Sequence, residues 1–501
     1  MKILGRELSV KNLIDNPDDD FLRQRCFKYG ALITQFGNLA VISKVKSRSA
    51  KFTEIILRDP THKENDLVDA VFAYLKTKDV IQLDRRMCQH PDFNYACRLY
   101  VTEGFPRLPL MWGNTMFEPE NKDPDFITIA VPEWPERKVL VFPEHGVTLS
   151  LGTDYKGEIK KSMLRQVMYW VKKKGSLGLH AGSKIIRVDK GNGVENVGFI
   201  FFGLSGTGKT SLTCHGHWLS SPEGVVIRQD DVVILRQDGS CIGTEDSFYV
   251  KTDGLEPMNQ PLIYAACLSP RTILENVMIK GDNKEVDFMD TSLTSNGRAM
   301  VKRSDLAFTD KEVDLPKANN IVFIMRRRDI VPPVMKLGPE WGAAAFMLGE
   351  SVETSAGDPA NAGKSLRVVG TNPFIVGSEA EEGNIFLELL RKNQDLNCYI
   401  INTGSIGGEQ GGAKITLRET VKIIEMIARD KIEWRRDPFW GYDVPVGIPD
   451  VSLERFDLAN FYNRDEIEKR SKDLKAERLA WLEQFEKEGM SSEIIKALKG
   501  D

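Results

Sequence analysis

The stretch FFGLSGTGKTSL, residues 201–212, constrains the fold more than any other part of the chain. The apolar run GVENVGFIFF leads into it, and residues 203–210 match the pattern G-x-x-x-x-G-K-[ST]. Glycines in such a turn let backbone N–H groups converge on phosphate oxygens, while the lysine reaches the β- and γ-phosphates and the threonine hydroxyl can bind magnesium. The pattern therefore predicts a buried strand, a phosphate-binding loop and a helix rather than an ordinary glycine-rich turn.

A pair of carboxylates follows a second apolar run, VVIRQDD. Asp230 and Asp231 come at the end of this predicted strand, where a metal-holding carboxylate is needed beside a phosphate-binding loop. A solvated turn is the alternative interpretation. The lysine motif about twenty residues earlier favours the metal site.

Length and charge limit the class of protein. A chain of 501 residues is too long for one simple core, and it predicts several domains or a two-lobed enzyme. Lys+Arg 68 against Asp+Glu 72 gives a formal charge of -4, so we expect neither nucleic acid nor a membrane as a partner. No run approaches the ~20 apolar residues that a membrane-spanning helix needs, and the charged N-terminus is unlike a signal peptide. These features predict a cytoplasmic protein.

The cysteines carry little functional signal. Seven are scattered along the chain without a CxxC pair, which argues against a disulfide framework and against a thiolate zinc site. We expect most of them to be core thiols.

The pattern of elements changes near Gly175. Residues 1–175 alternate β-rich runs such as ALITQFGNLAVIS with helical patterns, and they predict a mixed α/β lobe. Residues 157–175 are expected to form a helix, with Lys160 and Lys161 in its first turns. Residues 176–501 are expected to form a lobe around the phosphate-binding loop, with further strands at NNIVFIM and NCYIINT and an amphipathic C-terminal helix after Arg455.

The residues of the loop and the order of the other motifs resemble those of the ATP-dependent phosphoenolpyruvate carboxykinase family. GLSGTGKTSL resembles that family's kinase motif, GTDYKGEIKKSM its tyrosine and lysine segment, LGLHAGS its histidine segment and RQDDVVIL its aspartate pair. Further segments follow in the family's order, from FYVK to KITLRET, and AERLAWLEQFEKE resembles its last helix. The resemblance implies a two-lobed α/β fold with an N-terminal substrate-binding lobe and a C-terminal nucleotide- and metal-binding lobe.

Residue roles follow where these segments match. For the substrate the resemblance implies Arg48, Tyr155 and Arg298; for catalysis it implies Lys161, Lys209, Arg298 and Ser205. For a transition metal it implies Lys161, His180 and Asp231, with Thr210 binding a second ion. For the nucleotide it implies Gly203, Leu204, Ser205, Gly206, Thr207, Gly208, Lys209, Thr210, Ser211, Asp230, Lys414 and Thr420.

Two of these roles differ from what the residues alone indicate. A lone histidine such as His180 is more often structural than a ligand. Lys161 by itself would be a solvated helix residue, because a lysine binds a metal only when it is neutral, a state that needs burial or nearby cations. Both assignments therefore depend on the resemblance.

The sequence departs from the family's pattern near several of these residues. Ala50 and Phe52 stand for a proline and an aspartate, and the run after His180 is Ala-Gly-Ser-Lys in place of Cys-Ser-Ala-Asn. Val232 and its neighbours replace polar residues after the aspartate pair, and Lys414 replaces an arginine, which removes a planar, stacking contact. The segment VVGTNPFIVGSE stands where the family has a cysteine-containing run. The changes fall around the metal site and the base rather than on the phosphate contacts.

The resemblance implies a two-step reaction. Oxaloacetate loses CO2 to give an enolate, and the γ-phosphoryl group of ATP is transferred to the enolate oxygen, giving phosphoenolpyruvate and ADP with Mn²⁺ and Mg²⁺ as cofactors. Two alternatives stay open: a kinase of the same fold that phosphorylates another small acid or a protein side chain, and a nucleotide-sensing protein without turnover. The oligomeric state cannot be predicted from the sequence.

Overall fold

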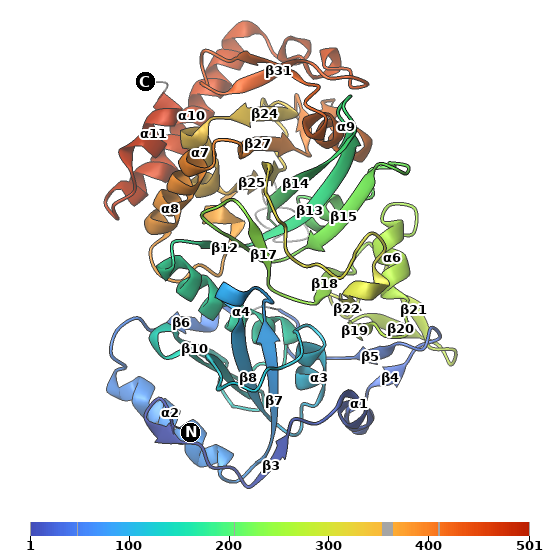
Figure 1. Cartoon of the computed structure of the whole chain (residues 1–501), viewed down its shortest axis with the longest axis vertical. Helices are drawn as coiled ribbons and strands as arrows, with labels where there is room; N and C mark the ends of the chain where they lie inside the picture. The colour runs from blue at the N-terminus through green and yellow to red at the C-terminus, as the bar shows by residue number, and fades with distance from the viewer. Residues whose placement is uncertain (1, 48, 205, 353–363, 409–410, 500–501) are drawn as a thin grey trace. The chain divides into compact units, whose positions relative to one another are not determined.

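A computed structural model describes residues 2–47, 49–204, 206–352, 364–408 and 411–499 (Figure 1). The chain forms two compact units, one of residues 1–171 and 244–307, the other of residues 172–243 and 308–501. The first break lies close to the expected boundary at Gly175. Residues 244–307, which the sequence assigned to the second lobe, belong to the first unit, because their strands pair with the chain near residue 40.

The first unit contains a seven-stranded mixed sheet, and the apolar face of one helix packs against this sheet. The helix α2 (His62–Leu75) starts at a capping box in which Thr61 and Glu64 bond each other's backbone N–H. Its buried residues Val68, Val71, Phe72 and Leu75 repeat every three or four positions and form one core with the sheet. The strand order is β3 (Asn12–Asp15), β7 (Asp79–Met87), β8 (Tyr95–Thr102), β9 (Phe126–Val131), β11 (Val147–Leu151), β10 (Lys138–Phe142) and β6 (Thr53–Ile55).

A second, five-stranded sheet joins distant parts of this unit. Its strands lie in the order β18 (Ser247–Lys251), β22 (Arg298–Lys302), β19 (Ile273–Glu275), β5 (Leu39–Val41) and β4 (Leu32–Ile33). The unit also contains the hairpins β1–β2 (Lys2–Ile3, Arg6–Glu7) and β20–β21 (Met278–Lys280, Glu285–Asp287), and the helices α1 (Asp19–Lys28), α3 (Arg107–Gly113) and α6 (Pro261–Cys267). The helix α4 (Lys156–Lys173) confirms the helix expected at 157–175 and passes the break between the units.

An eight-stranded sheet forms the centre of the second unit. Its order is β15 (Gly224–Gln229), β13 (Ala181–Asp189), β14 (Val194–Gly203), β23 (Asn320–Met325), β27 (Asn397–Asn402), β24 (Val334–Leu337), β31 (Asp443–Gly447) and β30 (Glu433–Arg436). The strands β14, β23 and β27 run parallel, and they are three of the strands predicted from sequence. Smaller sheets combine β12 (Leu177–Leu179) with β16 (Val233–Leu235) and β17 (Cys241–Gly243), β25 (Glu350–Val352) with β26 (Ser365–Arg367), and β28 (Ser405–Ile406) with β29 (Ala413–Lys414).

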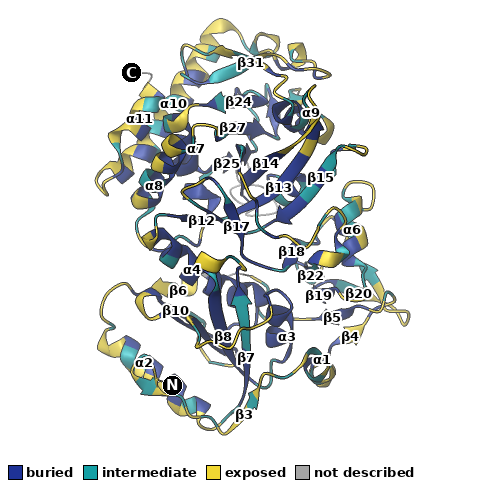
Figure 2. Ribbon diagram, in the orientation of Figure 1, coloured by how far each residue is buried: buried dark blue, intermediate teal, exposed yellow. Residues whose placement is uncertain are grey.

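Helices cover both faces of this sheet. Alternate residues of a strand point to opposite faces, so Ile200 and Phe202 enter one core while Phe199 and Phe201 enter the other. The first core is closed by α7 (Pro339–Leu348), α8 (Glu379–Lys392), α10 (Arg464–Glu486) and α11 (Ser492–Lys499), and the second by α5 (Lys209–Thr213) and α9 (Leu417–Ala428). Figure 2 shows the buried strands between helices whose outer faces are exposed. The predicted C-terminal helix is confirmed as α10 and α11, but it begins at Arg464 rather than at Arg455.

The cysteines are core thiols, as the sequence predicts. All seven are buried and free, and burial raises the pKa of Cys26 to about 12. Within the described residues, no helix is long and apolar enough to cross a membrane.

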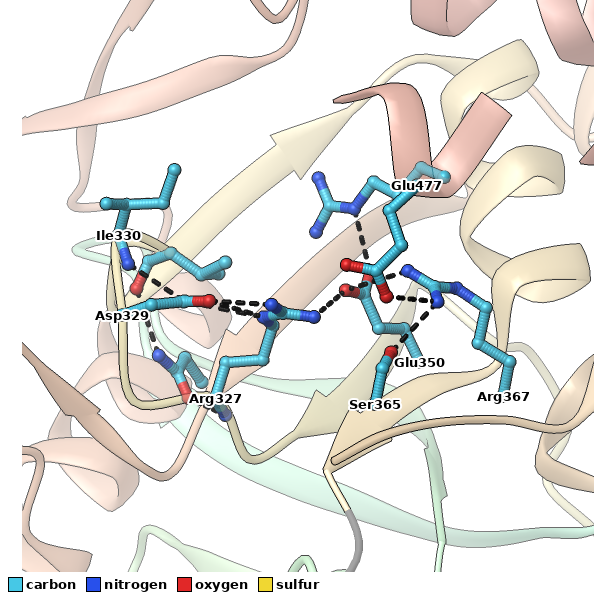
Figure 3. A network of polar contacts seen from close by, with 10 residues as sticks. Arg327, Asp329, Ile330, Glu350, Ser365, Arg367 and Glu477 are labelled. Atoms are coloured by element: carbon cyan, nitrogen blue, oxygen red, sulfur yellow. Dashed lines mark hydrogen bonds and ion pairs between the residues drawn. The ribbon is translucent and has the colours of Figure 1, made fainter. Parts of the chain in front are cut away.

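A buried carboxylate ties the β25–β26 hairpin to the C-terminal helix (Figure 3). Glu350 accepts hydrogen bonds from Arg327 at 2.6 Å and from Arg478 of α10 at 2.8 Å, and Arg367 lies 3.5 Å away. Burial alone would raise the pKa of Glu350, but the three guanidinium groups outweigh it and lower that pKa to about 2. The carboxylate therefore stays ionised and holds three cations.

This network should make the stability of the protein fall in acid. Because the folded pKa of Glu350 lies below its ordinary value of 4.5, its contribution is present above pH 4.5 and is lost as the pH falls toward 2, by about 3 kcal/mol in all. Glu350→Gln should lower the free energy of unfolding at pH 6 by about 3 to 5 kcal/mol, since it removes the buried anion that three arginines share and leaves only Arg327 and Arg367 with another carboxylate, from Asp329 and Glu477. Urea unfolding followed by tryptophan fluorescence at several pH values measures both effects.

The matched control is Glu340→Gln, which alters a half-exposed ion pair with Arg391. It should cost less than about 1 kcal/mol and leave the pH dependence unchanged. A Glu350→Gln variant as stable as the parent at pH 6 would contradict the assigned role of the network.

Candidate functional site

The phosphate-binding loop has the tight backbone that the glycines predict. The strand β14 ends at Gly203, where a Cβ atom would lie 2.5 Å from the Thr207 hydroxyl oxygen. Thr207 turns its N–H and hydroxyl back to the carbonyl oxygen of Leu204, at 3.2 and 2.8 Å. Gly208 has a φ of 105° and caps α5, whose first residues are Lys209 and Thr210. A side chain at Gly208 would be strained, so its glycine sets the path of the loop into the helix.

Hydrogen bonds connect this loop to the segment expected to hold the base and ribose. The Thr403 hydroxyl lies 2.9 Å from the Thr207 carbonyl oxygen and 3.0 Å from that of Met325. Next along the chain, the Gly404 carbonyl oxygen accepts the Ile415 N–H. This chain of bonds connects the phosphate-binding loop with the segment that contains Lys414, whose side chain is exposed. Thr420 is buried in α9, and its hydroxyl donates to the Thr416 carbonyl at 3.0 Å.

The second unit also brings His180 and Asp231 together. His180 lies between β12 and β13, and its Nε2 is 3.1 Å from Oδ1 of Asp231. The same carboxylate oxygen lies 4.0 Å from Nζ of Lys209. Asp230, the other member of the pair, is buried. Three residues predicted from separate motifs therefore meet next to α5.

The chemistry of this pair fits a metal ion. Nδ1 of His180 lies 2.7 Å from the Thr371 carbonyl oxygen, which can only accept, so Nδ1 carries a proton and the neutral ring presents the lone pair of Nε2. A backbone carbonyl behind a histidine is the usual way to orient a metal ligand. Two electron-pair donors, Nε2 and the Asp231 carboxylate, face each other and are suited to share a cation. Among the residues that the structure describes, no group of three histidine, cysteine or acidic side chains is arranged so that it could hold a metal ion.

In the first unit, three distant segments meet at the start of α4. Asp154 accepts from the backbone N–H groups of Lys44 and Val45 at 2.9 and 2.8 Å. Asn296 donates to the Lys46 carbonyl at 2.8 Å and to the Tyr155 hydroxyl at 3.1 Å. These bonds bring together residues 44–46, the start of α4 and residue 296.

Asn296 also orients one of the predicted substrate residues. Its Oδ1 accepts from Nη2 of Arg298 at 2.8 Å and from Nε at 3.2 Å. One amide side chain therefore contacts both Tyr155 and Arg298.

Cations surround the ring of Tyr249 in the same unit. The ring centroid lies 4.1 Å from Nζ of Lys156, 5.6 Å from the Arg298 guanidinium and 5.9 Å from Nζ of Lys160. Lys156 and Lys160 are one helical turn apart on α4, so both reach the same ring. Lys161, the next residue, is buried as well. The cluster is strongly cationic.

Two glutamates offset only part of this charge. Lys160 forms a fully buried ion pair with Glu245 at 2.6 Å. Glu275 accepts hydrogen bonds from the backbone N–H of Lys156 at 3.3 Å and from the Tyr249 hydroxyl. Burial raises the pKa of both Glu275 and Tyr249. Three cations lie near one ring together with two carboxylates, and burial disfavours the ionised form of Glu275, so the cluster suits an anionic ligand.

The structure thus distributes the predicted site residues over the two units. Tyr155, Lys161 and Arg298 belong to the first unit, and the loop, His180 and the aspartates belong to the second. Arg48 and Ser205 lie outside the described residues; Ser49, which follows Arg48, donates its backbone N–H to Glu158 of α4 at 3.0 Å.

Sequence reasoning missed Lys156, Tyr249, Asn296, Glu245 and Glu275 as members of the cluster. Only the run KGEIKK carried a signal, because it places two lysines four residues apart on one helix.

Comparison with known proteins supports the resemblance. A strand that ends in a glycine turn with Lys209 and a carboxylate partner defines a P-loop nucleotide-binding protein. The family model for phosphoenolpyruvate carboxykinase matches residues 11–454. A phosphoenolpyruvate carboxykinase (ATP) of Aeropyrum pernix is 33% identical over 93% of this chain and 94% of its own length, and one of Thermus thermophilus is 29% identical over 86% and 83%. The chain belongs to the phosphoenolpyruvate carboxykinase family, as its motifs predict.

Proposed function

We propose that this member of the family converts oxaloacetate and ATP into phosphoenolpyruvate, CO2 and ADP, and catalyses the reverse reaction. The carrying observation is the cationic cluster around Tyr249, in which Asn296 connects Tyr155 with Arg298. Such a cluster suits a small dianion such as oxaloacetate, and a P-loop suits the polyphosphate of ATP. The two kinds of anion site are those that this reaction requires.

The nucleotide would be held by residues of the second unit. The loop backbone from Gly203 to Gly208 would surround the phosphates, with Leu204, Ser205, Gly206 and Thr207 between them and Ser211 after the motif. Lys209 would contact the β- and γ-phosphates, and the segment of Lys414 and Thr420 would contact the base and ribose. Asp230 would lie beside the nucleotide-bound ion.

The acceptor would be held by residues of the first unit. Arg298 and Tyr155 would bind the carboxylate and carbonyl oxygens of oxaloacetate, in positions fixed by Asn296. The resemblance to the family adds Arg48 to these substrate-binding residues. Lys156 and Lys160 would lower the energy of the anionic states near them, because both ammonium groups lie close to the same ring as Arg298.

The chemistry passes through one enolate. The bond between the leaving carboxylate and its neighbouring carbon breaks, CO2 departs, and the electron pair remains as the enolate of pyruvate. The enolate oxygen then forms a bond to the γ-phosphorus of ATP while the bond to the bridging oxygen of ADP breaks. Lys209 would stabilise the negative charge that develops on the β-phosphate, and Arg298 would stabilise the charge of the transferred phosphoryl group.

Two metal ions belong to this proposal. A transition metal such as Mn²⁺, held by His180 and Asp231, would stabilise developing negative charge, and Mg²⁺ at Thr210 would accompany the nucleotide. Resemblance adds Lys161 of α4 as a third ligand. The orientation of His180 by the Thr371 carbonyl supports its place in the ligand set.

A coupled assay tests the reaction. Purified protein with phosphoenolpyruvate, bicarbonate, ADP and Mn²⁺ should form oxaloacetate, detected as malate by the oxidation of NADH, while GDP or inorganic phosphate in place of ADP as the phosphoryl acceptor should not support it. Lys209→Ala should reduce the rate at least about 100-fold, because it removes the cation beside the transferred phosphate. Binding of ADP without any oxaloacetate would contradict the proposal and direct the search to another acceptor.

Asn296→Ala tests the acceptor site separately from the nucleotide site. Loss of the amide releases both Tyr155 and Arg298, so the KM for phosphoenolpyruvate should rise about 10-fold or more while the KM for ADP stays within about 2-fold. Steady-state kinetics with each substrate varied in turn measures both.

The control is Asn114→Ala, which removes a buried asparagine of the same unit that bonds Asp19 and the Leu110 carbonyl. It should lower the melting temperature without changing either KM. Equal effects of the two variants would mean that Asn296 has only a structural role.

His180→Ala tests the metal site by binding rather than by activity. The affinity for Mn²⁺, measured by electron paramagnetic resonance of the free ion, should fall more than about 10-fold, and the same should hold for Asp231→Asn and Lys161→Ala. His62→Ala, at an exposed histidine that begins α2, should bind Mn²⁺ as the parent does. Unchanged Mn²⁺ affinity in the His180 variant would exclude it as a ligand.

A further inference from the structure

The strand β13 presents two unusual residues to the helix of the phosphate-binding loop. Gly182 and Lys184 point to the same face of the sheet as Ile186 and Val188, the face on which α5 packs. A Cβ atom at Gly182 would lie 2.4 Å from the Thr213 hydroxyl oxygen, so the glycine permits the close approach of α5. A local irregularity in the pairing with β15 falls between Ser183 and Lys184. The Lys184 side chain thus lies between the sheet and α5 and reaches the C-terminal end of this helix.

Lys184 is completely buried, and three acceptors surround its ammonium group. Nζ lies 2.5 Å from the Leu212 carbonyl oxygen, 3.2 Å from the His215 carbonyl oxygen and 2.7 Å from Nε2 of His217. An ammonium group has three N–H donors, so this arrangement can satisfy all of them. The ring of Phe201 lies 5.2 Å away on the sheet side.

The histidines of this cluster are suited to remain uncharged, so that His217 can accept a hydrogen bond from Lys184. Burial, aided by Lys184, lowers the pKa of His215 to about 4 and holds the pKa of His217 well below its ordinary value. Both rings are therefore neutral near pH 7, and Nε2 of His217 has a lone pair for Lys184. Burial also lowers the pKa of Lys184 to about 7, so the ammonium form prevails only in slightly acidic solution.

The helix that Lys184 contacts is short. It spans five residues, Lys209–Thr213, and its capping residue Cys214 is followed by the non-helical run 215–218, in which His217 and Trp218 have positive φ. A helix of one turn has few internal hydrogen bonds, and its last carbonyl groups lack helical partners. A cation at this end supplies donors to those carbonyls and complements their partial negative charge.

We propose that Lys184 is a positioning residue for ATP: by binding the Leu212 carbonyl in the last turn of α5 and the His215 carbonyl just after it, Lys184 fixes the helix whose first residues, Lys209 and Thr210, would contact the phosphates. The proposal rests on the nucleotide site described above. It assigns a role to a lysine that stands where the resembled family has an asparagine. The ammonium group of Lys184 contacts α5 and the run 215–217 that follows it, so Lys184 would act on the nucleotide through these segments.

A series of substitutions at Lys184 tests the proposal in the full-length protein at pH 6.5. Lys184→Met removes both charge and donors, Lys184→Gln keeps two N–H donors without the charge, and Lys184→Arg keeps the charge. The dissociation constant of a fluorescent N-methylanthraniloyl-ADP, measured with Mg²⁺, should rise about 10-fold or more for Met and Gln and less for Arg. Melting temperatures are measured in parallel.

A second buried lysine provides the matched control. Lys172 donates to the Val376 carbonyl at 2.9 Å and pairs with Glu381 and Glu382, within the same unit and away from the loop. Lys172→Met should lower the melting temperature as Lys184→Met does but leave ADP affinity unchanged. If Lys184→Met lowers only the melting temperature, Lys184 is merely structural and the proposal is wrong.

Two further outcomes are informative. If Lys184→Met does not fold, the comparison of Gln with Arg decides, and equal ADP affinity in these two variants and the parent overturns the proposal. Lys209→Ala separates this inference from the nucleotide site on which it rests. If Lys209→Ala binds ADP and transfers phosphate as the parent does, the nucleotide assignment itself fails; if it is impaired while the Lys184 series is not, only the positioning role fails.

Discussion

Buried ammonium groups impose the strictest requirement on this structure. Removing a charge from water costs several kcal/mol unless polar groups replace the lost hydration. Lys156, Lys160, Lys172 and Lys184 are all buried, and each lies against an aromatic ring, a carboxylate or carbonyl oxygens. Because these partners come from strands and helices far apart in sequence, the lysines can be accommodated only when both the sheets and the helices have assembled.

The same requirement separates two kinds of cationic site. In the second unit, the ammonium group of Lys184 has three hydrogen-bond acceptors nearby, two of them backbone carbonyls, so its three donors can all be used within the protein. Around Tyr249 in the first unit, three cations lie near one ring, an arrangement that suits a substrate anion. An enzyme that handles an enolate and a triphosphate needs both: rigid support behind the loop, and unbalanced charge where negative charge develops.

Local chemistry explains what could be predicted from sequence. The loop at 203–210 and the strands on either side of it follow from a motif whose backbone demands are strong, whereas the pairing of His180 with Asp231 was expected only from the family resemblance. The return of residues 244–307 to the first unit could not be predicted, because strand pairing between residue 40 and residue 274 leaves no trace in spacing. Asn296 and Lys184 were missed for a similar reason: their roles depend on partners more than 25 residues away along the chain.

The seven buried cysteines have a practical consequence. Their thiols lie away from solvent, and burial holds the pKa of Cys26 and of several others far above neutrality, so few reactive thiolates are present in the native protein. The natural sequence therefore offers a nearly silent background for chemical labelling. A single cysteine introduced on the surface of each unit would carry a spectroscopic probe without removal of any native residue, and slow modification of the native thiols would report the rate at which each core opens.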